Sequence, residues 1–240
     1  MKLTIEPDDA DPFEFECEDT IASAWVSKDI LSNRTYPVMP FVEDVRVVLD
    51  AGGNCGAAAV HFARHYPDAT IHTFEPGSHQ RAFLERNALH LPGIAIHPIA
   101  LHREDGEMPL YQGDSDSGMS SLEASEWATE SHETVTVRSA GGWAAEHGVD
   151  RIDVMKLDVE GSEVDVLESL GSLLATVKVL YVEYDSRRAR RDIDRILEPT
   201  HDLYSGKVLL DQGELVYLSK REANRPEAMD HLRSIFVPDA

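Results

Sequence analysis

One stretch of the sequence decides the fold. Residues 47–56 read VVLDAGGNCG, a buried-strand run that ends in an acid and a glycine turn, and a helical pattern follows it directly. Strand, turn and helix in this order form a nucleotide site in many α/β proteins. Gly52, Gly53 and Gly56 allow a positive φ and a close approach of the backbone to a ligand. We therefore expect this turn, including Asn54, to bind a nucleotide-containing ligand.

Outward from this stretch, short β-branched runs alternate with helical stretches. Such alternation is typical of βαβ units and predicts an α/β fold with a mostly parallel, doubly wound sheet. The predicted strands are residues 45–49, 70–74, 94–98, 153–157 and 178–182, and the predicted crossover helices are residues 57–66, 78–90 and 163–174.

Two places break the alternation. Residues 108–112 and 134–138 have the pattern of an inserted pair of strands. Residues 206–210 and 214–218 flank the tripeptide Asp-Gln-Gly, which is a hairpin signal. A C-terminal antiparallel hairpin is therefore expected to close the sheet.

The chain shows no internal repeat and is expected to form one domain with appended ends. We place the domain at residues 41–220. An N-terminal extension, residues 1–40, contains a short helix predicted over 19–31, whereas residues 1–18 are acidic and lack a clear period. Residues 221–240 are assigned to a C-terminal tail.

Charge and composition exclude several classes of partner. The chain has 44 acidic and 22 basic side chains and a formal net charge of −22, which repels nucleic-acid phosphates. Its basic stripe, Arg187–Arg191, is followed by acids and is interpreted as a solvated helix face. No apolar run approaches the roughly 20 residues of a membrane span, and Cys17 and Cys55 lack metal-type spacing. We expect a cytoplasmic protein, and its scarce lysine suggests adaptation to high salt.

Two acids near the glycine turn narrow the ligand class. Asp50 disfavours a pyrophosphate, because the loop has no lysine or arginine to offset its charge. Glu75 ends the next strand, where an acid can accept both ribose hydroxyls. S-adenosylmethionine combines a ribose with an ammonium and a sulfonium, so we expect Asp50 to favour its cationic end and Glu75 to hold its ribose. The structural alternatives are that Asp50 caps the next helix and that Glu75 is a plain turn acid.

A second acidic cluster follows two later strands. Lys156, Asp158 and Glu160 end one strand, and Glu183 ends its neighbour. Since ligands bind beyond the carboxyl ends of parallel strands, these acids should face the same crevice as the glycine turn. The functional interpretation is that Asp158, Glu183 and Lys156 position an acceptor hydroxyl, with a carboxylate as base. A divalent cation held by these oxygens is less favoured, and a structural ion-pair network that includes Glu163 is the other alternative.

Three motifs resemble the FkbM-type S-adenosylmethionine-dependent methyltransferases. The family patterns Asp-x-Gly-x-Asn-x-Gly, Phe-Glu-Pro and Lys-x-Asp-x-Glu-Gly-x-Glu are matched in order by residues 50–56, 74–76 and 156–163. The resemblance implies a Rossmann-like class I methyltransferase fold and a cofactor contact from Ser121. It also implies O-methylation of a hydroxyl on a sugar, a glycolipid or another small metabolite. At 139–140 the chain has Ser-Ala where the family often has Leu-Asp, so no role is carried over there.

Two other functions share parts of this pattern. A nicotinamide-dependent oxidoreductase would also use the strand, the turn and Glu75, but Asp50 and the four-residue spacing of Gly52 and Gly56 oppose it. A non-catalytic nucleotide-binding domain would keep the fold without transferring a methyl group. The intact acidic segment at 156–163 argues against that interpretation.

Overall fold

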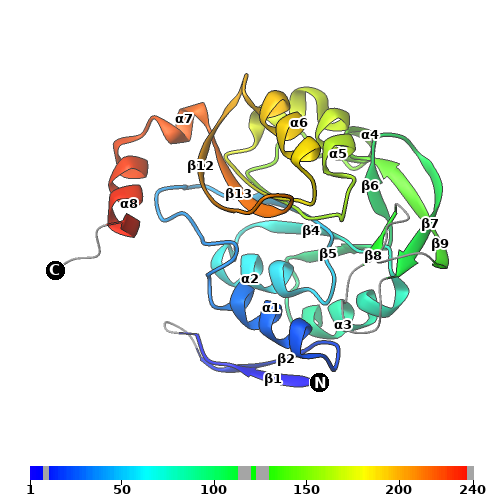
Figure 1. Ribbon diagram of the computed structural model, residues 1–240. Helices are drawn as coiled ribbons and strands as arrows, with labels where there is room; N and C mark the ends of the chain where they lie inside the picture. The colour runs from blue at the N-terminus through cyan, green and yellow to red at the C-terminus, as the bar shows by residue number, and fades with distance from the viewer. Residues whose placement is uncertain (8–10, 113–119, 123–129, 237–240) are drawn as a thin grey trace.

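The computed structural model describes residues 1–7, 11–112, 120–122 and 130–236. Within these residues the central sheet has the spatial order β12 (His201–Val208), β13 (Gly213–Ser219), β11 (Val179–Tyr184), β10 (Val154–Leu157), β3 (Val47–Ala51), β4 (Thr70–Phe74) and β5 (Ile94–His97) (Figure 1). The strands β11, β10, β3, β4 and β5 are parallel, and β13 is antiparallel to both β11 and β12. The predicted α/β fold, with its C-terminal antiparallel hairpin, is confirmed.

Helices cover both faces of this sheet (Figure 1). One face carries α1 (Ile21–Leu31), α2 (Ala57–His65) and α3 (Ser78–Ala88), and the other carries α4 (Ala140–Glu146), α5 (Glu163–Leu170) and α6 (Arg187–Leu197). Successive strand residues point to opposite faces, so Val48 packs in one core and Leu49 in the other. Val154 and Met155 divide in the same way. Burial on both sides explains the continuous apolar runs in the sequence.

The helix boundaries follow local backbone chemistry. The predicted N-terminal helix is confirmed as α1, which begins after Thr20, whose hydroxyl accepts a hydrogen bond from the amide of Ser23 at 3.1 Å. The helix predicted over 163–174 is shorter, because Gly171 adopts a φ of +56° and a 3₁₀ turn, Gly171–Thr176, replaces the last α-helical turn.

The ends of the chain contain structure that the sequence did not reveal. A hairpin of β1 (Lys2–Ile5) and β2 (Phe13–Glu16) forms within residues 1–18, where no hydrophobic periodicity was recognised in the sequence. Both strands alternate apolar and polar residues, with Leu3 and Ile5 buried in β1 and Phe15 buried in β2, but each alternation extends over only four residues. After β13, α7 (Lys220–Ala223) and α8 (Pro226–Phe236) occupy the predicted tail. The first hairpin strand, β12, also begins at His201 rather than at 206.

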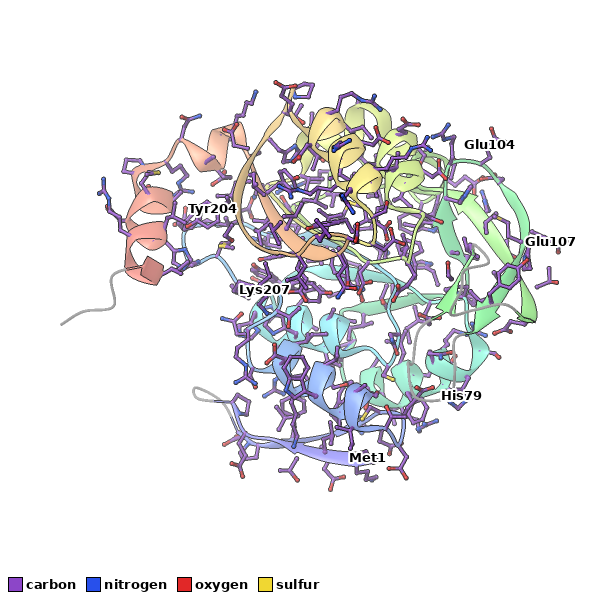
Figure 2. All side chains as sticks on the ribbon, viewed as in Figure 1. Met1, His79, Glu104, Glu107, Tyr204 and Lys207 are labelled. Atoms are coloured by element: carbon purple, nitrogen blue, oxygen red, sulfur yellow. The ribbon has the colours of Figure 1, made fainter. Side chains whose placement is uncertain are left out.

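A smaller sheet lies beside the β5 edge. Its strands, in spatial order, are β6 (Ala100–His102), β9 (Glu130–Ser139), β7 (Gly106–Gln112) and β8 (Ser120–Ser121). The predicted inserted strand pair is confirmed, because β7 and β9 pair antiparallel with Met108 opposite Val135. Figure 2 shows Glu107 on the outer side of this sheet.

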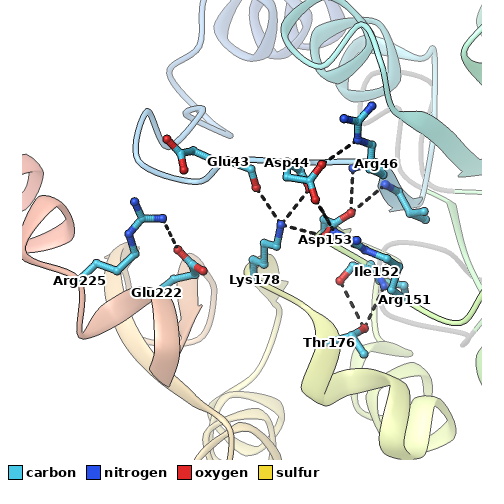
Figure 3. A network of polar contacts seen from close by, with 11 residues as sticks. Glu43, Asp44, Arg46, Arg151, Ile152, Asp153, Thr176, Lys178, Glu222 and Arg225 are labelled. Carbon is cyan, nitrogen blue, oxygen red and sulfur yellow. Dashed lines mark hydrogen bonds and ion pairs between the residues drawn. The ribbon is translucent and has the colours of Figure 1, made fainter.

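A polar network ties together the amino ends of the parallel strands, opposite the carboxyl ends (Figure 3). The buried carboxylate of Asp153 accepts hydrogen bonds from the amides of Arg46 and Val47 at 2.8 and 3.0 Å. It also pairs with Arg151 and, at 3.1 Å, with Lys178. This network fixes the start of β3 against β10 and β11.

Among the described residues, no helix has the length and apolar character needed to cross a membrane.

Candidate active site

Two adjoining cavities open where the parallel strands end. The first cavity is lined by the apolar side chains of Phe74, Leu101, Leu110 and Leu122 and by the acids Glu75, Asp158 and Glu160. The second cavity lies between α1, the glycine turn and the β12–β13 hairpin. Figure 2 shows Lys207 on the side of the hairpin that faces α1 and α2. Both cavities share Gly52, Asn54, Asp158 and Glu160.

Glu75 lies at the carboxyl end of β4 and is held by the glycine turn. One carboxylate oxygen accepts the amide of Asn54 and the other the amide of Gly77, both at 2.7 Å. Burial raises the pKa of Glu75 to about 7, although these two hydrogen bonds lower it. The carboxyl group lines the first cavity and retains lone pairs for further hydrogen bonds. Its predicted place beside a ribose stays a prediction.

The turn glycines make room for protein atoms. Gly52 has a φ of +81°, and a Cβ there would lie 1.8 Å from the carbonyl oxygen of Asp158. Gly56 has a φ of +92°, and a Cβ there would lie 2.6 Å from the side chain of Leu84 in α3. A side chain at either position would be strained and would clash. The glycines therefore set the distances from β3 to β10 and from α2 to α3.

Three charged side chains, Asp50, Lys156 and Asp158, lie close together at the ends of β3 and β10. Lys156 lies opposite Asp50 in the strand register, and its Nζ is 3.6 Å from Oδ1 of Asp50 and 3.2 Å from Oδ2 of Asp158. It also donates to the carbonyls of Ala51 and Gly52. Burial lowers the pKa of Lys156, but the two carboxylates more than offset this, so the net pKa is raised and the ammonium persists.

Asp50 lies behind this lysine, because it is fully buried and lines neither cavity. Its Oδ2 accepts a hydrogen bond from Thr73 at 2.7 Å. The predicted contact between Asp50 and the cationic end of a donor stays a prediction. The observed geometry gives Asp50 an indirect path to the cavities through Lys156.

Glu160 and Glu183 add two carboxyl groups without a basic side chain within 4 Å in the described part of the chain. Both line the second cavity. Burial raises the pKa of Glu183, and Asp158 and Glu160 raise it further. The pKa of Glu160 is raised by burial and then by Asp158. Glu160 also has a φ of +55°, a conformation uncommon outside glycine that is found at ligand sites.

Ser121 contacts this acidic segment. Its hydroxyl donates to the carbonyl of Glu160 at 2.7 Å, and its neighbour Leu122 lines the first cavity. A direct contact between Ser121 and a cofactor stays a prediction.

No group of three or more His, Cys, Asp or Glu residues in the described ranges is arranged to hold a metal ion.

Residues 18–36 form part of the lining of the second cavity. The sequence pattern over residues 19–31 predicted a helix that could cover one edge of the site, but it did not single out the residues that line the cavity. Tyr36 is buried, and its hydroxyl donates to Oδ2 of Asp158 at 3.3 Å. Trp25 and Val26 of α1 line the same cavity. No local pattern marks these residues, because they approach the site only through the packing of α1 on α2.

Comparison with known proteins identifies the family to which the chain belongs. The model of the methyltransferase FkbM domain matches residues 50–206, which is more than half of the chain. The chain belongs to the FkbM methyltransferase family. All three motifs of the expected resemblance lie within the matched range, so the resemblance is confirmed.

The curated relatives are named as methyltransferases. The chain is 33% identical over 166 residues to Methyltransferase 1 of Beauveria bassiana, covering 61% of this chain and 66% of that protein. It is 26% identical over 155 residues to the 2-O-methyltransferase NoeI of Sinorhizobium fredii, covering 59% and 64%. The aligned region thus spans just under two thirds of each relative.

Solved structures share the class I methyltransferase fold. The fibrillarin pre-rRNA processing protein of Methanococcus jannaschii has a TM-score of 0.52 at 12% identity, covering 91% of this chain and 83% of that chain. At this identity the likeness shows the fold alone.

Proposed function

We propose that this FkbM methyltransferase transfers the methyl group of S-adenosylmethionine to a hydroxyl on a sugar, a glycolipid or another small metabolite. The observation that carries the proposal is the adjacency of the two cavities, which share Asp158 and Glu160. Two substrates bound there would meet beside those carboxylates. Holding both reactants at one junction contributes several kcal/mol to the reduction of the barrier.

The lining of the first cavity suits the polarity of S-adenosylmethionine. Its apolar wall, with Phe74 and Leu101, offers a surface for an adenine ring, and Glu75 can accept ribose hydroxyls. Asp158 and Glu160 lie at the boundary with the second cavity, where negative charge favours a sulfonium. S-adenosylmethionine supplies an electrophilic methyl group when it is bound. The residues of the first cavity would bind and orient it.

Glu183 is the base that the geometry favours. It lines the second cavity but not the first, and it has no basic side chain within 4 Å among the described residues. Asp158, by contrast, is already held by Lys156 at 3.2 Å and by Tyr36 at 3.3 Å. As the acceptor oxygen bonds to the methyl carbon and the carbon–sulfur electron pair passes to sulfur, Glu183 would take the hydroxyl proton. Asp158 would orient the acceptor, and Lys156 would position Asp158.

The acidic side chains of the second cavity also disfavour a dinucleotide ligand and a nucleic-acid partner. The charge of Asp158 would repel the phosphates of a nicotinamide dinucleotide or of a nucleic acid, and Glu160 and Glu183 add no positive charge that would offset this repulsion. A donor with a sulfonium and a hydroxyl acceptor carry no such charge. The absence of a nucleic-acid partner therefore remains part of the proposal.

Calorimetric titration of the whole chain with S-adenosylmethionine, S-adenosylhomocysteine and NAD tests the proposal. We expect saturable binding of the first two and none of NAD. The variant Glu75→Gln should bind both donor compounds more weakly, because its amide cannot accept from both backbone amides and a ribose together. Circular dichroism checks that the variant folds. Binding of NAD alone would replace the proposal with the oxidoreductase hypothesis.

A further inference from the structure

Part of the lining of the second cavity comes from a segment outside the family domain. Residues 18–36 precede the matched range of 50–206, yet they supply one side of the cavity from Glu18 on to Tyr36. The opposite side and the floor come from the glycine turn, the strand ends and the hairpin. The matched range thus provides the residues that the second cavity shares with the first, and the N-terminal segment provides another part of its lining.

This N-terminal wall is fixed by polar contacts. Asp29, near the end of α1, accepts hydrogen bonds from Arg34 at 2.6 Å and from Thr35 at 3.1 Å. The carbonyl of Tyr36 contacts Nε2 of His61 in α2 at 3.0 Å. The hydroxyl of Tyr181 donates to the carbonyl of Pro37 at 2.5 Å. A wall anchored at both α2 and β11 is pre-organised to bind a ligand.

The wall exposes apolar surface at the cavity. Trp25 is 65% exposed and Val26 is 48% exposed, and both line the second cavity. Ile21, on the same helix, is 89% exposed but does not line it. An indole side chain offers a large, rigid contact area at a small cost in conformational entropy. The second cavity therefore has carboxyl groups near Glu183, and Trp25 and Val26 add apolar side chains on its α1 side, where Ser23, Ser27 and Asp29 also line it.

We propose that Trp25 is a specificity-determining residue that contacts an apolar portion of the acceptor while the acceptor hydroxyl reaches the acidic floor. This inference rests on the proposed function, since it assigns the second cavity to the acceptor. The favoured acceptor then has two parts: a hydroxyl-bearing head beside Asp158 and Glu183, and an apolar group that packs on Trp25. Ile21, although more exposed, has no part in recognition.

Two glycosides that differ only in their apolar part test this assignment. Methyl β-D-glucopyranoside and hexyl β-D-glucopyranoside are titrated into the full chain saturated with S-adenosylhomocysteine. We expect the hexyl compound to bind the wild type about tenfold more tightly, because it buries apolar area on Trp25. Trp25→Ala should bring the two affinities close together, Trp25→Phe should restore most of the difference, and Ile21→Ala should behave as the wild type.

Each other outcome overturns the inference. It fails if the wild type does not prefer the hexyl compound, including the case in which neither glycoside binds. It also fails if Trp25→Ala retains the preference, or if Ile21→Ala loses it equally. Titration of the same four proteins with S-adenosylmethionine distinguishes failure of this inference from failure of the proposed function. Intact donor binding without a hexyl preference rejects only the role of Trp25. Absent donor binding in the wild type rejects the proposed function as well.

Discussion

The hydroxyl of Tyr36 donates a hydrogen bond to Oδ2 of Asp158 at 3.3 Å, across 122 positions of sequence. Lys156 contacts the same oxygen at 3.2 Å from within β10. The carboxylate of Asp158 is thus held by one donor from the family domain and one from the N-terminal segment. Burial raises the pKa of Tyr36 well above its usual range, so its hydroxyl remains a donor at any working pH.

Tyr36→Phe should therefore reduce turnover without weakening donor binding. The variant removes one hydrogen bond to Asp158 and keeps the ring contact with Tyr181, whose centroid lies 5.6 Å away. We expect kcat to fall about three- to tenfold and the unfolding free energy to fall by about 1 kcal/mol. Steady-state kinetics and calorimetry with S-adenosylmethionine measure the two effects. An unchanged kcat with weakened donor binding would contradict the role assigned to Tyr36.

Glu183 should make turnover depend on pH. Since burial, Asp158 and Glu160 raise its pKa, the carboxyl group is largely protonated at low and neutral pH and cannot accept the hydroxyl proton. We expect kcat to rise as the pH increases from neutrality toward about 9, the raised pKa of Glu183. Glu183→Gln should lower kcat by about 10²- to 10⁴-fold and abolish this rise. The remote surface variant Glu107→Gln serves as control, and a wild-type pH profile in Glu183→Gln would remove Glu183 as the base.

The sequence predicted the features of the site that depend on local spacing. The glycine turn, Glu75 and the acids after β10 and β11 lie at the carboxyl ends of strands because strand, turn and helix follow each other directly in the chain. Lys156 lies in a strand that the sequence predicts to be covered on both faces, so its charge needs a carboxylate, which Asp158 or Glu183 could supply, and Asp158 is confirmed as a partner. These features are encoded within about ten residues of each motif, where periodicity is informative.

Features that depend on register and long-range packing were not predicted. Asp50 lies behind Lys156 because the two residues are directly opposite in the pairing of β3 with β10. Nothing local to residues 50–56 reveals that pairing. Likewise, the wall that contains Trp25 exists because α1 packs on α2, and a weak helical pattern does not state which helix it covers.

Asp153→Asn should destabilise the fold without touching the cavities. Burial raises the pKa of Asp153, but hydrogen bonds from Arg151, the amides of Arg46 and Val47, and Lys178 outweigh it, so the net pKa is lowered. A lowered folded-state pKa contributes stability above the unfolded pKa, and this contribution is lost as the pH falls through the folded value. We expect a loss of about 1–3 kcal/mol at about pH 7 that shrinks below about pH 4.

Denaturant unfolding of wild type and Asp153→Asn at several pH values measures this effect. Donor binding should be equal in the two proteins under folded conditions, since Asp153 lies at the amino ends of the strands (Figure 3). A stability difference that grows in acid would show that the network does not hold the charged form of Asp153.

Alanine substitutions at two glycines with positive φ distinguish the effect of backbone strain from the effect of a steric clash at the site. Gly148 has a φ of +66°, and a Cβ there would have nothing within 4 Å, whereas a Cβ at Gly52 would lie 1.8 Å from the carbonyl oxygen of Asp158. Gly148→Ala should cost about 1 kcal/mol through strain alone and leave donor binding unchanged. Gly52→Ala carries the same kind of strain and must also displace β10 from β3, so we expect a larger loss of stability and at least a roughly tenfold loss of donor affinity. Thermal unfolding and calorimetry of the two variants measure these effects side by side, and equal losses in both would mean that the approach of Gly52 to Asp158 does not shape the site.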